Sequence, residues 1–101
     1  MEDKQIVIDL DAMNESKLML MGAQIRYMLD SMFGNAPITA MIKGEKRKVE
    51  AFGRALSSEK KYMDAYIKHG LADARTHRNA SMLTRAVSAF EKVTGLRWPV
   101  K

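Results

Sequence analysis

The sequence of 101 residues contains no cysteine, which excludes a disulfide framework and thiolate chemistry. With two prolines, six glycines, 47% hydrophobic and 29% charged residues, the composition is that of a globular chain rather than a disordered one. No stretch approaches the roughly 18 uncharged apolar residues of a membrane-spanning helix. The N-terminus begins acidic and lacks the long apolar segment of a signal peptide. We therefore expect one domain over residues 1–101, no membrane association and a cytoplasmic location.

Residues that could carry catalysis are also scarce. His69 and His77 are the only imidazoles, and neither belongs to a set of carboxylates or thiols at metal-ligand spacing. The sequence has no glycine-rich phosphate-binding loop, and no serine belongs to a recognisable catalytic set. We therefore expect a protein that is not an enzyme and that holds no metal and no cofactor.

The stretch IVIDLDAM, residues 6–13, resembles the opening motif of haloacid-dehalogenase-like phosphotransferases. The resemblance implies a nucleophile at Asp9 and a second acid at Asp11. That fold needs a parallel sheet of several strands to bring further catalytic groups to the strand end, and the sequence offers no second strand. A helix N-cap at Asp11 explains the pattern with fewer requirements, which favours a non-catalytic protein.

The N-terminal third predicts one strand followed by one helix. Residues 5–9, QIVID, have the β-branched density of a short strand and form the only such run. The next segment predicts a helix capped by Asp11 or Asn14 and extending to Phe33. Its apolar residues cover nearly every side, so this helix is either central in its domain or shared with a partner.

The remaining chain predicts two or three further helices. One begins at Pro37, and its apolar stripe starts with Ile38 and Ile42 and continues as far as Ile67, before Gly70 ends the segment. We favour a break in it at Ser57 and Ser58, because helices average about 11 residues. The last helix begins at Thr76 or Asn79 and ends at Gly95. The nine-residue connection before it is too long for a helix-turn-helix, unless part of this connection is itself a helical turn. Trp98 is expected to close the core. The expected fold is mainly α: a small helical bundle of three to four helices with one short N-terminal β-strand.

The formal charge of +5 is distributed unevenly. Residues 1–35 carry three basic and six acidic side chains, whereas residues 36–101 carry fourteen basic and six acidic ones. A basic excess of this kind favours an acidic partner, either nucleic acid or an acidic protein surface.

The basic residues recur at helical spacing along two predicted helices. The candidates for contact with nucleic-acid phosphates are Lys43, Arg47, Arg54, Lys61, Lys68, Arg78, Arg85 and Lys92. Several of them follow one another at intervals of seven, which places them on one side of each helix. A solvated amphipathic face, with surface pairs such as Lys46 and Glu50, explains the same pattern without a ligand.

The N-terminal residues favour a protein interface. Five of the nine methionines lie in the first predicted helix, and methionine adapts to partner surfaces. An unpaired strand needs a neighbour, which a second copy could supply, so we expect a homo-oligomer. The interface candidates are Ile6, Ile8, Met19, Leu20 and Tyr27.

The stretch FEKVTGLRWP, residues 90–99, resembles the ends of short proteins of tailed bacteriophages. The resemblance implies a small viral accessory or structural role, in the host cytoplasm or the virion. The sequence thus predicts a non-catalytic binding protein that associates with the nucleic-acid backbone through a basic helical surface. The alternative is a protein-binding modulator, adapter or virion component that acts through its methionine-rich first helix.

Overall fold

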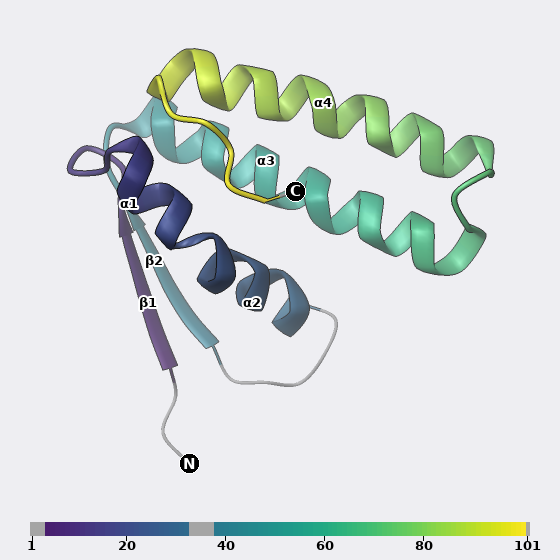
Figure 1. The fold of residues 1–101 in the computed structure, drawn as a ribbon, viewed down its shortest axis with the longest axis horizontal. Coiled ribbons are helices and arrows are strands. Elements are labelled where there is room, and N and C mark those ends of the chain that lie inside the picture. Colours follow the sequence, from purple (N-terminus) through teal and green to yellow (C-terminus); the bar gives the residue numbers. More distant parts are fainter. Residues whose placement is uncertain (1–3, 33–37, 101) are drawn as a thin grey trace.

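The computed structural model describes residues 4–32 and 38–100. In chain order these residues form β1 (Lys4–Asp9), α1 (Glu15–Leu20), α2 (Gly22–Met32), β2 (Ile38–Lys43), α3 (Lys46–His69) and α4 (Ala74–Thr94) (Figure 1). The described part is therefore a small, mainly α-helical bundle with a short strand pair near its N-terminus, which confirms the predicted fold class.

The expectation of a single strand was wrong, because β1 pairs in parallel with β2 from Lys4 opposite Ile38 to Asp9 opposite Lys43. We expected Ile38 and Ile42 at the start of a helix. Their spacing of four residues fits one side of a helix, but it equally fits one face of a strand. Gly44 follows β2 with φ of 140°, and a Cβ there would lie 3.1 Å from Cβ of Leu10. Glycine thus permits the close turn that leads from β2 into α3.

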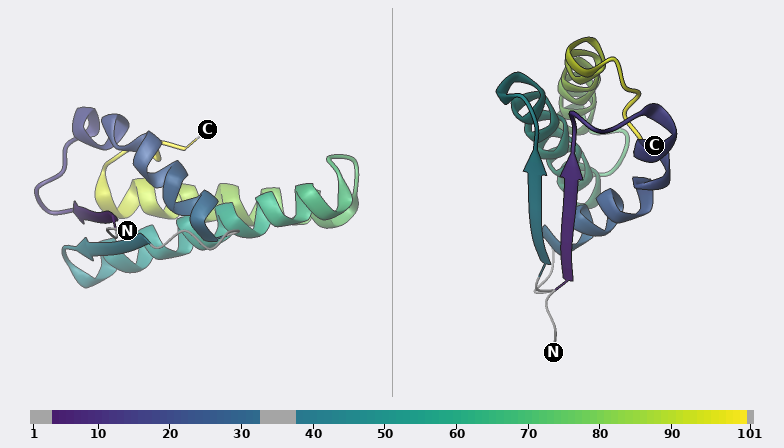
Figure 2. Two further views of the ribbon diagram at one scale, coloured as in Figure 1. Left: turned by 90° about the horizontal axis from the view of Figure 1, so that it is seen from below. Right: turned by 90° about the vertical axis from the view of Figure 1, so that its left-hand side faces the viewer.

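The predicted break at Ser57 and Ser58 is absent, since α3 is one helix of 24 residues. Asp73 rather than Thr76 or Asn79 caps α4, and its side chain accepts the backbone N–H of Arg75. The connection from Gly70 to Asp73 is shorter than expected, because part of the polar segment is helical. Figures 1 and 2 show α3 and α4 side by side as an antiparallel hairpin, so they lack the crossing angle of a helix-turn-helix.

The first predicted helix is divided into α1 and α2 at Met21. Asn14 is the N-cap of α1, as one of the two expected residues, and its side chain accepts the backbone N–H of Lys17. At the division, a Cβ on Gly22 would lie 3.3 Å from the carbonyl oxygen of Pro99. The C-terminal segment therefore runs close to the start of α2.

The core lies where the inner face of the sheet meets the helices. Phe52 of α3, Phe90 of α4 and Trp98 stack edge to face, with ring centroids 5.1 to 6.1 Å apart. Trp98 is 5% exposed, so it closes the core as expected. The rest of the buried cluster comes from β1 and the turn after it, from α1, α2 and α3, and from the C-terminal segment: Ile6, Ile8, Leu10, Leu18, Ile25, Met28, Ala51, Ala55 and Leu96. Within the described ranges, every helix is too short or too polar to cross a bilayer.

Candidate nucleic-acid interface

The basic stripes of α3 and α4 meet along one face of the hairpin. Two adjoining surface hollows of about 470 and 290 Å³ lie there, and both include Lys61. We call this surface the basic groove. Its charged lining consists of Arg54, Lys61, Lys68, Arg75 and Arg78 with Glu50 and Asp64. Five permanent cations thus face two carboxylates in one concave surface.

Four of the predicted phosphate-binding residues lie in this groove, namely Arg54, Lys61, Lys68 and Arg78. Arg47 precedes Arg54 by seven residues on α3, and Arg85 and Lys92 follow Arg78 at the same interval on α4. Because seven residues make almost two helical turns, these three exposed side chains lie on the same side of their helices as the groove cations, but they are not part of its lining.

Lys43 does not belong to the stripe, because it ends β2 rather than lying on a helix. Lys48, which belongs to the same dense run of cations between Lys43 and Lys48, makes a contact outside the groove. The Lys48 ammonium lies 3.2 Å from Oδ1 of Asp11, which also accepts the backbone N–H of Glu45. Both contacts lower the pKa of Asp11, and the hydrogen bond from the Glu45 backbone has the larger effect. They tie the turn after β1 to the start of α3.

The groove contains cations that no carboxylate neutralises. Lys68 pairs with Asp64 at 3.1 Å, and this exposed pair contributes little to stability. Among the described residues, Arg54, Lys61 and Arg78 have no ion pair within 4.0 Å. Their charges are therefore available to an external anion.

Arg75 is a groove residue that the sequence did not indicate. Its guanidinium donates two hydrogen bonds of 3.0 Å to the carboxylate of Asp73. The same contacts hold the pKa of Asp73 far below its usual range and raise that of Arg75. We assigned this segment to a loop, whereas it forms the first turn of α4. The sequence did contain a signal that places Arg75 in the groove, because Arg75 precedes Arg78 by three residues and so shares its side of a helix.

The two acids of the phosphotransferase-like motif have structural partners. Asp9 accepts the backbone N–H groups of Asp11 and Ala12 at 3.1 and 3.4 Å, and Asp11 contacts Lys48 and Glu45. A parallel neighbour for β1 exists, contrary to expectation, but the sheet of the described residues has two strands. Those residues also contain no group of three or more potential metal ligands.

The predicted interface residues are dispersed. Ile6 and Ile8 are buried in the chain's own core, so they are not available to a second copy, and the unpaired-strand argument for an oligomer fails. Leu20 is 82% exposed on α1, Tyr27 is exposed on α2, and Met19 is half-buried. Of the methionines in this region, Met13, Met21 and Met28 pack in or against the core.

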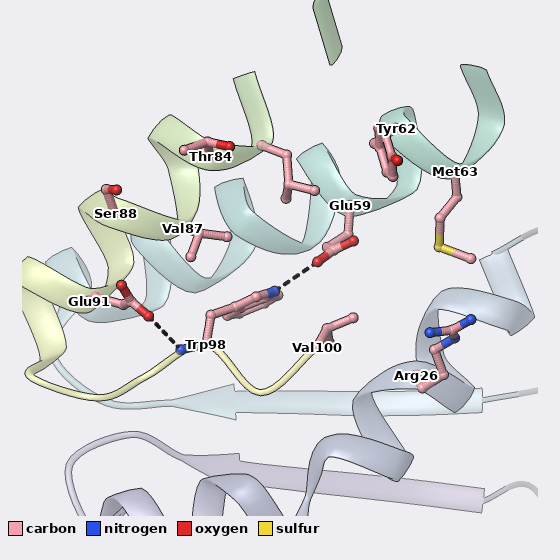
Figure 3. Close-up of a pocket in the computed structure, with 11 residues that line it drawn as sticks. Arg26, Glu59, Tyr62, Met63, Thr84, Val87, Ser88, Glu91, Trp98 and Val100 are labelled. Atoms are coloured by element: carbon pink, nitrogen blue, oxygen red, sulfur yellow. Dashed lines mark hydrogen bonds between the residues drawn. The ribbon is translucent and has the colours of Figure 1, made fainter. Parts of the chain in front are cut away.

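A second concave surface lies on the opposite side of α3 and was not predicted at all. It is a hollow of about 500 Å³ between the hairpin, α2 and the C-terminal segment (Figure 3). Glu59 is buried in its wall, where Oε1 accepts a hydrogen bond from Nε1 of Trp98. Burial raises the pKa of Glu59, although the Trp98 hydrogen bond and the nearby Arg26 act in the opposite direction. Glu59 stands in the charged stretch SEKK, residues 58–61, which gave no indication of burial.

Comparison with known proteins gives no assignment: no protein-family model, curated protein or solved structure matches the chain.

Proposed function

We propose that the protein binds the phosphate backbone of nucleic acid in the basic groove. The observation that carries this proposal is the convergence of three unneutralised cations, Arg54, Lys61 and Arg78, from two helices into one concave surface. Cations in such a groove replace the counterions that surround a polyanion, and the released counterions drive association.

The chemistry of the groove supports contact with phosphates rather than with bases. Apart from His69, its lining contains no aromatic side chain on which an unpaired base could stack. Figure 1 also shows α3 and α4 side by side and antiparallel, without the crossing of a helix-turn-helix, the motif that places its second helix in a major groove. We therefore expect binding with little dependence on base sequence.

Titration of a short mixed-sequence duplex and of its single strands tests this function at about 50 mM salt, where phosphate contacts are strong. The double variant Arg54→Glu and Lys61→Glu should lose binding. A control variant, Lys17→Glu with Arg97→Glu, changes the net charge equally but leaves the groove intact, and it should bind nearly as well as the unaltered protein.

Competition with polyglutamate distinguishes the two possible acidic partners, nucleic acid and an acidic protein surface. It carries carboxylates at high density but no phosphate. If polyglutamate competes as effectively as the nucleic acids, the groove recognises acidic protein surfaces instead, and the nucleic-acid proposal is wrong. Absence of any binding to duplex or single strands would also contradict it.

A further inference from the structure

The hollow beside Glu59 continues along α3 beyond the core. A second hollow of about 260 Å³ adjoins it, and the two share Arg26, Tyr62 and Met63. The second hollow ends at Tyr66 and Ile67, which are 50% and 69% exposed. We call this continuous surface the tail groove, because Trp98 and Val100 of the C-terminal segment, residues 96–100, line its first part.

The C-terminal segment shows how a chain without regular secondary structure packs here. Leu96 and Trp98 are buried and Val100 packs against the core, whereas Arg97 between them is exposed. From Leu96 to Trp98 this alternation is that of an extended chain with one face toward the protein, whereas Pro99 lies against the start of α2. The backbone N–H of Trp98 donates to Oε2 of Glu91 on α4 at 3.1 Å. The C-terminal segment thus forms one wall of the tail groove, and apolar side chains and one amide-to-carboxylate bond hold it there.

The part of the tail groove beyond Val100 repeats these features. Glu59 is 7% exposed and uses Oε1 for the Trp98 indole, while Figure 3 shows its other oxygen directed along the hollow toward Tyr62. Arg26 lies across the hollow on α2. Among the described residues, no ion pair within 4.0 Å joins Arg26 to Glu59. An acceptor and a donor therefore face the same space from opposite walls.

A peptide amide satisfies both groups at once, since its N–H can donate to Glu59 while its carbonyl accepts from Arg26. A neutral amide also suits this site, because the charges of Glu59 and Arg26 on its two walls already balance each other. Beside the polar Thr84, Ser88 and Glu91, the hairpin side of the hollow carries the apolar side chains of Met63, Leu83 and Val87. They offer hollows to alternate side chains of an extended segment.

We propose that the open part of the tail groove binds an extended apolar segment of a partner protein, with one backbone amide between Glu59 and Arg26. The exposed Tyr66 and Ile67, which line the second hollow together, extend the contact area, and exposed apolar side chains gathered in one place are typical of an interaction site. The site lies on the opposite side of α3 from the basic groove. It is therefore independent of the proposed nucleic-acid function and would make the hairpin a two-faced adapter.

Trp98 provides a local reporter, because it is the only tryptophan and its indole N–H contacts Glu59. The probe is the capped peptide acetyl-Leu-Ser-Leu-Ser-Leu-amide, titrated to about 5 mM against ¹⁵N-labelled protein. We expect a saturable shift of the indole resonance. A version of the peptide methylated on its backbone nitrogens should bind at least tenfold more weakly, because it lacks the amide donors.

Substitution of exposed residues then locates the site without disturbing the fold. Ile67→Lys should weaken peptide binding at least fivefold, whereas Leu20→Lys, an equally exposed apolar-to-charged change on α1, should leave it unaltered. No saturable shift at about 5 mM peptide would overturn the proposal. Equal affinity for the methylated peptide would overturn it too, as would equal weakening by both lysine variants.

Discussion

The indole Nε1 of Trp98 donates a hydrogen bond of 3.0 Å to Oε1 of Glu59, and this bond joins the C-terminal segment to the middle of α3 across 39 positions of sequence. It gives a buried carboxylate a donor while the tryptophan ring packs against Phe52 and Phe90. The same contact lies between the aromatic core and the tail groove, so it links the stability of the fold to the geometry of that groove.

Trp98→Phe should destabilise the protein even though an aromatic ring remains in the core. The change removes the indole N–H and leaves the Glu59 carboxylate buried without that donor, which costs about 1–3 kcal/mol in free energy of unfolding. Urea denaturation measures the difference. In a Glu59→Leu background, where no carboxylate needs a donor, the same Trp98→Phe change should cost less. An equal cost in both backgrounds would show that lost ring packing, not the hydrogen bond, is responsible.

Glu59 should also make stability depend on pH in an identifiable direction. Because the pKa of Glu59 is raised by folding, the folded state retains its proton longer than the unfolded state does. The free energy of unfolding therefore falls as the pH rises from the ordinary value of about 4.5 through the raised pKa. Folding lowers the pKa of Asp11 and of Asp73, so these two carboxyl groups make the free energy of unfolding rise with pH, in a lower pH range.

Glu59→Gln isolates this contribution, since glutamine keeps an acceptor for Trp98 but does not ionise. The free energy of unfolding of the variant minus that of the unaltered protein should be larger at pH 7 than at pH 4. Urea denaturation of both proteins at both pH values measures this difference. The contributions of Asp11 and Asp73 cancel in this comparison because both proteins contain them. A stability difference that does not change with pH would contradict the buried, ionising role of Glu59.

Thr76 should secure the turn between α3 and α4. Its side chain is buried, and its hydroxyl donates to the carbonyl oxygens of Gly70 and Ala65 at 2.7 and 3.2 Å. Thr76→Val keeps the shape but removes both bonds, which should cost about 1–2 kcal/mol and increase amide exchange at the end of α3. The matched change Thr84→Val, at an exposed hydroxyl that bonds Ala80, should stay within about 0.5 kcal/mol. Similar costs at both sites would refute a special role for Thr76.

The helices were predictable because their apolar residues recur with a clear helical period, but their ends depended on tertiary contacts. Ile38 and Ile42 fit a helix as well as a strand, and only pairing with β1 decides between the two. The serines at 57 and 58 suggested a helix start, yet packing against α4 keeps α3 continuous. Local sequence carries no information about these distant partners.

The two candidate sites, the basic groove and the tail groove, also differ in how far the sequence indicated them. Spacing along each helix indicated the two basic stripes, but their convergence required the antiparallel arrangement of α3 and α4. The tail groove could not be foreseen, since Glu59 stands in a polar run and its donor lies far along the chain at Trp98. Patterns within one element predict which residues share a face, whereas the pairing of faces depends on the fold.

The central claim, phosphate binding in the basic groove, is tested most directly by the salt dependence of duplex affinity. Each phosphate contact contributes about −0.9 to the slope of log K against log salt concentration. We predict that neutralising two groove cations, by Arg54→Gln with Lys61→Gln, reduces the steepness of that slope by about 2 units. The paired control Lys17→Gln with Arg97→Gln should leave it unchanged. A slope that is the same in both variants would contradict the account.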